Sequence, residues 1–103
     1  MIDTISPSTL YEWLKKEEVC LIDVREKEEY ELAHINPCTL VPLSSFNISQ
    51  LPESEKPYVI YCRSGKRSGY ILGLIKNLNP SLTVYNLEGG ILDWIHLGLP
   101  VQK

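Results

Sequence analysis

One stretch of this chain limits its fold more than any other, because an apolar run leads through a short turn directly into an amphipathic segment. Residues 58–61 are Tyr-Val-Ile-Tyr, a run of strand length, and Cys62 follows at its end. Apolar residues then recur at helical spacing over 70–78, and another apolar run covers 82–85. A strand, a helix and a strand in this order predict two parallel strands joined by a right-handed crossover.

Strand and helix patterns also alternate through the rest of the chain. Ser6 and Pro7 suit the start of a helix, because serine caps helix N-termini and proline fits the first turn. Further patterns predict strands at 19–24 and 39–41, and short helices at 26–33 and from Gly89-Gly90 through Trp94. We therefore expect an α/β fold, with a small, mostly parallel central sheet flanked by helices, in a single domain of residues 1–103.

Parallel strands place their carboxyl ends along one edge of the sheet, where open α/β folds bind ligands. In this chain that edge would gather the charged segment Asp23-Val24-Arg25, the turn after Cys62, and residues 87–90. The sequence thus predicts one site that is made of three separated segments.

The turn after Cys62 is suited to holding an anion. It carries three cations within six residues and precedes a helix N-terminus, whose free N–H groups and dipole attract negative charge. We expect these features to lower the pKa of the Cys62 thiol from an ordinary value of about 8.5, so that Cys62 acts as a nucleophile. The alternative is a core thiol beside a solvated charge cluster. The residues expected to bind substrate are Arg63, Ser64, Gly65, Lys66 and Arg67, with Ser64 and Gly65 acting through backbone N–H groups.

The overall charge favours a small anionic partner over a nucleic acid. Ten basic and thirteen acidic residues give a net charge of −3, so the cations after Cys62 are a local patch on an acidic chain. No apolar run is long enough to cross a membrane, and the N-terminus lacks the basic and apolar regions of a secretory signal. Because the three cysteines have no metal-ligand spacing, we expect a cytoplasmic protein with reduced thiols, no metal and no cofactor.

Four motifs of this chain resemble the rhodanese homology domain in their order and spacing, and the resemblance extends over almost the whole chain. The motifs are Asp23-Val24-Arg25, His34-Ile35, the loop from Cys62 to Arg67, and Gly89-Gly90 followed by Trp94. The resemblance implies a three-layer rhodanese-like fold and a thiosulfate sulfurtransferase activity. Cys62 would then take a sulfane sulfur from thiosulfate or a persulfide donor, carry it as a persulfide, and pass it to a thiol, cyanide or protein acceptor.

The chain departs from the family pattern at residues 33–38. Ala33 stands where relatives usually carry glycine before the histidine, and Pro37-Cys38 replaces a Gly-Ala pair. If the helix end before His34 required a left-handed residue, Ala33 would be strained by about 1 kcal/mol. These positions lie outside the loop after Cys62, so the departure concerns the local backbone more than the activity.

Two other functions compete with sulfur transfer. Cysteine phosphatases of the same fold place five residues between cysteine and arginine, whereas four separate Cys62 from Arg67. The shorter loop makes a smaller cradle, which suits a single sulfur better than the tetrahedral oxyanion of a phosphatase or arsenate reductase. The other alternative is a non-catalytic persulfide carrier or regulatory binding module, with which the presence of Cys62 is compatible.

Several other residues of the motifs have structural interpretations. We expect Asp23 and Arg25 to form an ion pair at the rim of the site rather than to act in catalysis. His34 is expected to satisfy backbone groups at a helix end. Trp94 is assigned to the core, and Cys20 is assigned there as a buried, inert thiol.

The last two interpretations concern Cys38 and a run of acidic residues. Cys38 is assigned to packing, with the alternative that it is a resolving thiol that forms a disulfide with Cys62. A solvated helix face is predicted for four glutamates, namely Glu26, Glu28, Glu29 and Glu31.

Overall fold

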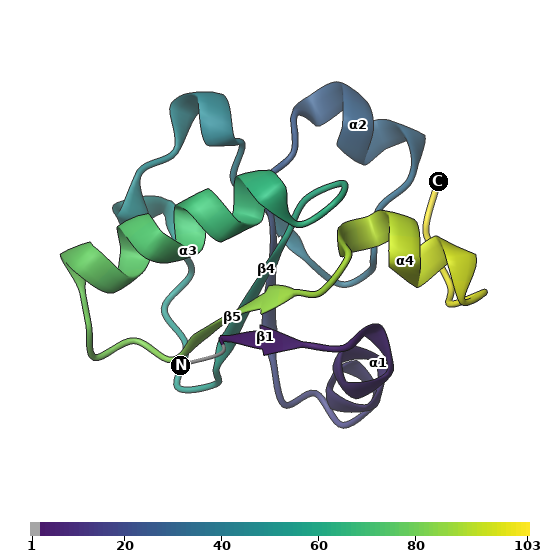
Figure 1. Cartoon of the computed structure of the whole chain (residues 1–103), viewed down its shortest axis with the longest axis horizontal. Coiled ribbons are helices and arrows are strands. Elements are labelled where there is room, and N and C mark those ends of the chain that lie inside the picture. Colours follow the sequence, from purple (N-terminus) through teal and green to yellow (C-terminus); the bar gives the residue numbers. More distant parts are fainter. Residues whose placement is uncertain (1–2) are drawn as a thin grey trace.

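The computed structural model describes residues 3–103, which form a five-stranded sheet of order β1-β5-β4-β2-β3 (Figure 1). Every pair of neighbouring strands in this sheet is parallel. The predicted α/β fold with a mostly parallel sheet is therefore confirmed. The strands are β1 (Thr4–Ile5), β2 (Cys20–Asp23), β3 (Thr39–Leu40), β4 (Tyr58–Tyr61) and β5 (Val84–Leu87).

Helices cover both faces of the sheet, which gives the three layers that the rhodanese resemblance implies. Figure 1 shows α3 on one side of the strands and α1 and α4 on the other. Ile71 and Ile75 of α3 pack on one core, whereas Leu10 of α1 and Trp94 of α4 pack on the other. The helices are α1 (Pro7–Lys15), α2 (Lys27–Leu32), α3 (Lys66–Leu78) and α4 (Gly90–His96), with 3-10 turns η1 (Leu43–Ser45) and η2 (Ile48–Gln50).

Strand β4 lies at the centre of the sheet, and its successive residues face the two cores in turn. All of its residues are buried, as expected for an apolar run that is covered on both sides. Val59 and Tyr61 face the α1/α4 core, while Ile60 and the following Cys62 belong to the α3 core. The alternation of the strand thus places the thiol on the α3 side of the sheet.

The ends of the elements agree with the sequence patterns except at β1 and β5. Ser6 caps α1 as predicted, because its Oγ accepts a hydrogen bond of 3.1 Å from the Thr9 N–H. The sequence predicted β5 at 82–85, but the strand spans Val84–Leu87. Asn86 interrupts the apolar pattern before Leu87, so the predicted strand ended too early, and a two-residue strand such as β1 is too short to produce any periodic signal.

The parallel arrangement brings three chain segments to one edge of the sheet. Asp23 ends β2, Cys62 follows β4, and Glu88 follows β5. This edge is where the sequence predicted the site. Within residues 3–103, no helix has both the length and the apolar character that crossing a membrane requires.

Candidate active site

Cys62 begins a tight loop that ends at the N-terminus of α3. Gly65 is the N-cap of α3 and has φ +101°, a left-handed conformation that glycine adopts without strain. This turn directs the Gly65 N–H at Cys62, whose Sγ accepts the hydrogen bond at 3.1 Å. The Ser68 Oγ, in the first turn of α3, lies 3.3 Å from the same sulfur. The thiol is 1% exposed.

These donors determine the pKa of the thiol. Burial raises the pKa of Cys62, but hydrogen bonds from the Ser68 hydroxyl and from the backbone N–H groups of Ser68, Gly65 and Ser64 outweigh it. The pKa therefore lies below its ordinary value, in the predicted direction. The loop cations were expected to contribute much of this effect, whereas the leading contacts that lower the pKa come from N–H and O–H donors.

Ser68 and Asn86 are site residues that the sequence analysis missed. The Ser68 Oγ lies 2.6 Å from Asn86 Oδ1, and the Asn86 amide donates to the Gly65 carbonyl at 3.1 Å. Asn86 of β5 therefore ties the loop to the start of α3. The Ser68 hydroxyl has a single proton, so it donates either to the sulfur or to Asn86 at any moment. A polar residue in the middle of the β5 pattern was the available sequence signal.

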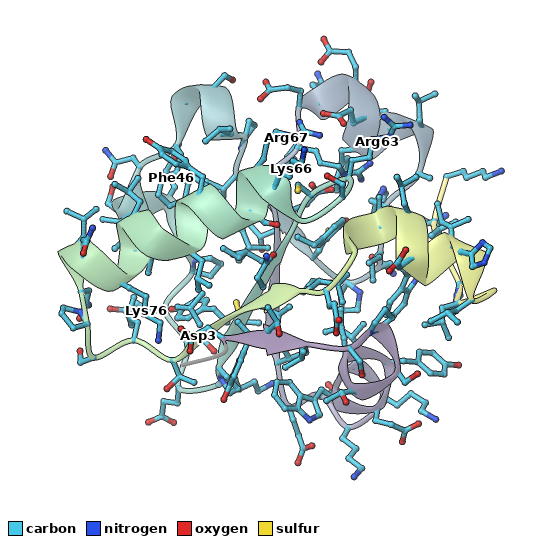
Figure 2. The ribbon with its side chains drawn as sticks, viewed as in Figure 1. Asp3, Phe46, Arg63, Lys66, Arg67 and Lys76 are labelled. Atoms are coloured by element: carbon cyan, nitrogen blue, oxygen red, sulfur yellow. The ribbon has the colours of Figure 1, made fainter. Side chains whose placement is uncertain are left out.

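The three loop cations have different surroundings (Figure 2). Arg67 is half-buried and forms a bidentate ion pair with Glu29 of α2, with both N–O distances at 2.8 Å. Arg63 and Lys66 are exposed, and neither forms an ion pair within the part of the chain that the structure describes. Only two of the predicted anion-binding cations are thus left without an acidic partner among these residues.

The prediction of a fully solvated acidic face on α2 is wrong for Glu26 and Glu29. The hydrogen bond from Arg67 lowers the pKa of Glu29 to about 2, despite the opposing effect of burial. Glu29 also accepts the Glu26 N–H at 3.0 Å, and the Glu26 carboxylate accepts the Ser44 hydroxyl at 2.7 Å. Glu28 and Glu31 are exposed, as predicted.

Asp23 and Arg25 form the predicted structural ion pair. The guanidinium contacts the carboxylate at 2.8 Å, and both residues are buried. Arg25 also donates to the Ala33 carbonyl at 2.7 Å, just beyond α2, and Tyr61 donates its hydroxyl to Asp23 at 2.8 Å. The pair therefore anchors α2 to the end of β2, which positions Glu29 beside the loop.

The chain after α2 shows how the departure from the family pattern is accommodated. Ala33 has φ −171°, which is extended backbone that any residue adopts, so no strain arises there. The His34 Nδ1 lies 2.9 Å from the Tyr30 carbonyl, and its backbone pairs with Gln102. This confirms the backbone role that was predicted for His34.

The other predicted core residues have mixed outcomes. Trp94 is buried as predicted, and its indole N–H donates to the Pro100 carbonyl at 2.8 Å. Cys20 is only half-buried, contrary to prediction, because it lies at the start of β2. This partial burial nevertheless raises the pKa of the Cys20 thiol.

Cys38 packs against the α1/α4 core, and burial raises its pKa to about 11. Since Cys62 belongs to the opposite core, this arrangement argues against a resolving role for Cys38.

The turn between β5 and α4 completes the site. The Ile91 N–H donates to the Cys62 carbonyl at 2.9 Å, and the Leu92 N–H donates to the Arg63 carbonyl at 3.1 Å. Gly90 has φ +63°, and a Cβ at this position would overlap the same two carbonyl groups. The close approach therefore requires glycine. Among residues 3–103, no group of three or more His, Cys, Asp or Glu side chains is arranged to hold a metal ion.

The fold and this loop define a class of α/β proteins in which a cysteine of lowered pKa follows a central parallel strand and is surrounded by N–H donors. The sequence profile of the Rhodanese-like domain matches residues 6–97. The chain belongs to the Rhodanese-like domain family.

Individual relatives agree with this assignment. The chain is 42% identical to an uncharacterized protein of Synechocystis, and the match covers 97% of this chain and 56% of that protein. It is 33% identical to a sulfurtransferase of Allochromatium vinosum, and the match covers 98% of this chain and 95% of that protein. A crystal structure of a rhodanese-related protein from Thermoplasma volcanium superposes with a TM-score of 0.85 at 31% identity, covering 96% of each chain. Against several other curated relatives, the chain spans only 24% to 59% of their length.

Proposed function

We propose that this protein is a sulfurtransferase that carries a sulfane sulfur as a persulfide on Cys62. The observation that supports this most strongly is the set of donors around Sγ, with Gly65 N–H at 3.1 Å and Ser68 Oγ at 3.3 Å, in a loop that lowers the pKa of the thiol. Membership of the Rhodanese-like domain family and similarity to a sulfurtransferase of Allochromatium vinosum agree with it.

The proposed reaction has two displacement steps. The Cys62 thiolate attacks the sulfane sulfur of thiosulfate or a persulfide, the S–S bond of the donor breaks, and its electron pair leaves with sulfite or a thiolate. A thiol, cyanide or protein acceptor then attacks the terminal sulfur and regenerates the Cys62 thiolate. Sulfite and thiolates are good leaving groups, so neither step needs a general acid beside Cys62.

Each loop residue has a proposed role in this reaction. The N–H groups of Ser64 and Gly65 stabilise first the thiolate and then the anionic persulfide. The exposed side chains of Arg63 and Lys66 attract an anionic donor. Arg67 closes the loop and, through Glu29, fixes its position against α2.

Intact mass measurement after incubation with thiosulfate tests the proposal. The wild-type protein should gain the mass of one sulfur atom, and added cyanide should remove it as thiocyanate. A Cys62→Ser variant should keep its fold, because serine is nearly isosteric, and should gain no sulfur. Equal masses before and after treatment with thiosulfate and with an organic persulfide would refute the proposal.

Two further readouts separate the alternative functions. Sulfur loading without repeated thiocyanate formation would indicate a persulfide carrier rather than a turning-over enzyme. Release of phosphate from an aryl phosphate would instead indicate a phosphatase. The four residues between Cys62 and Arg67 argue against that outcome, because the cradle is shorter than the phosphatase loop.

A further inference from the structure

The ion pair between Glu29 and Arg67 changes the charge that a substrate meets at this site. Both terminal nitrogens of Arg67 contact Glu29 at 2.8 Å, so this arginine cannot clamp an incoming oxyanion with both nitrogens unless the pair opens. Glu29 remains ionised at neutral pH. The rim of the loop therefore presents a neutral Glu29–Arg67 pair beside the cations Arg63 and Lys66, which form no ion pair among residues 3–103.

A pocket of about 200 Å³ lies beside the loop, between α2 and α4. Figure 2 shows Arg63 in this region, and the α4 backbone binds the Arg63 carbonyl. Much of the lining is apolar and accessible, since Leu32 is 77%, Leu92 45% and Ile95 47% exposed. Three charged residues also line the pocket, namely Glu29, Arg63 and Arg25, of which Arg25 is already paired with Asp23. A pocket of this size admits one small organic group rather than a larger ligand.

Resting on the sulfurtransferase function proposed above, we propose that this pocket, the donor pocket, binds the organic part of a singly charged sulfur donor. The chemical class is an organic persulfide, R–S–S⁻, or a thiosulfonate, R–SO₂–S⁻, with R against Leu92 and Ile95. Arg63 attracts the single charge. Glu29 disfavours the doubly charged, wholly polar thiosulfate, because it neutralises Arg67 and so leaves less positive charge at the rim to hold a second negative charge.

For a thiosulfonate, the sulfur transfer takes one step in which atoms and charges balance. The Cys62 thiolate attacks the terminal sulfur of R–SO₂–S⁻, a new S–S bond forms on Cys62, and the old S–S bond breaks. Its electron pair leaves with the sulfinate R–SO₂⁻, while Cys62 holds the persulfide anion. Two negative charges enter the step and two leave it, and no proton or external electron is required.

Paired donors test the role of Glu29. The value of kcat/KM is measured with cyanide as acceptor for benzenethiosulfonate, which has one charge and an apolar ring, and for thiosulfate. Glu29→Gln should raise kcat/KM for thiosulfate about three- to tenfold and should raise that for benzenethiosulfonate less. Glu28→Gln is the matched control, since Glu28 is exposed on the same helix, and it should leave the ratio unchanged.

A second variant tests the donor pocket and does not depend on the ion pair. Leu92→Ala should lower kcat/KM for benzenethiosulfonate about threefold or more, because apolar contact with the ring is lost, and should lower that for thiosulfate less. Leu78→Ala, at an exposed position at the end of α3, is the control.

The outcomes separate this inference from the proposed function. If Cys62 gains sulfur from neither donor, the sulfurtransferase proposal fails and the inference fails with it. If both donors load Cys62 but Glu29→Gln and Leu92→Ala leave their ratio unchanged, only the inference is overturned. Equal losses for both donors in either variant would also overturn it, because they would show a purely structural role.

Discussion

At the scale of single residues, the properties of Cys62 depend on a few short contacts. The sulfur is almost fully buried, which opposes ionisation, yet it faces the Gly65 N–H and the Ser68 hydroxyl. Hydrogen bonds to a charged acceptor are stronger than those to a neutral one, so these donors favour the thiolate. Asn86 competes for the Ser68 proton at 2.6 Å and thereby moderates this effect.

Replacing Ser68 with alanine should raise the pKa of the Cys62 thiol, because the largest of the contacts that lower it is lost. Ultraviolet thiolate absorbance as a function of pH measures this directly, and the acidic limb of the rate profile should move to higher pH. Ser64→Ala is the control, since Ser64 contributes its backbone N–H and its side chain is exposed. The same titration for wild type and Ser68→Ala would contradict this account.

At the scale of secondary-structure elements, Glu29 and Arg67 couple α2 to α3. The pKa of Glu29 is lowered from 4.5 to about 2 in the folded protein, mainly by Arg67. A carboxylate whose pKa is lower in the folded state than in the unfolded state stabilises the fold at pH values above its unfolded-state pKa. This stabilisation is lost as the pH falls through the folded-state pKa.

The coupling therefore predicts an acid-dependent loss of stability. The wild-type Tm should fall more steeply than that of Glu29→Gln between about pH 4.5 and pH 2, because only the wild type must protonate this carboxylate. Thermal melts across this range, followed by circular dichroism, measure the difference. Parallel curves would show that the ion pair contributes nothing to folding.

The end of α1 offers a prediction about backbone conformation. Glu17 has φ 56°, and the N–H groups of Glu17 and Glu18 bond to the carbonyls of Leu14 and Trp13 at 3.1 and 2.9 Å. This is a Schellman ending, in which glycine is preferred at the left-handed position. Glu17→Gly should raise the free energy of unfolding by about 0.5–1 kcal/mol, whereas Glu18→Gly should lower it by a similar amount. Urea denaturation distinguishes the two variants.

At the scale of the whole molecule, the candidate site is formed where the segments that follow three parallel strands, β2, β4 and β5, meet at one edge of the sheet. The loop after β4, the turn after β5 and helix α2 are distant in sequence, but the sheet order places β4 between β2 and β5. Gly90 marks a close approach between two of these segments, since its backbone lies against the Cys62 and Arg63 carbonyls. Changes at this junction should therefore affect both folding and sulfur loading.

Gly90→Ala should destabilise the protein by about 2 kcal/mol and reduce sulfur loading of Cys62, because the new methyl group must displace the loop backbone. Gly73→Ala is a matched control within α3, where no heavy atom lies within 4 Å of the added Cβ. It should stabilise the helix by about 0.5–1 kcal/mol. Equal stability and loading in both variants would disprove the proposed importance of this contact.

Some features of the protein follow from local sequence alone. The apolar run before Cys62, the helical spacing after it and the cap at Ser6 each depend on residues within one or two turns. Local periodicity, capping and charge therefore predicted the parallel α/β fold, the loop after Cys62 and the direction in which the pKa of its thiol is shifted. The short strand β1 and the last two residues of β5 were missed, because two residues carry no period and Asn86 interrupts the apolar pattern of β5.

Other features depend on which side chains the folded chain brings together. Arg67 meets Glu29 across 38 residues of sequence, and Ser68 meets Asn86 across 18. Neither partner could be identified from spacing, because a polar side chain on a helix or strand takes its direction from packing against distant elements. A cysteine of lowered pKa and its cationic loop were thus predictable from the sequence, whereas the Ser68 hydroxyl beside the sulfur and the carboxylate beside Arg67 were decided by tertiary structure.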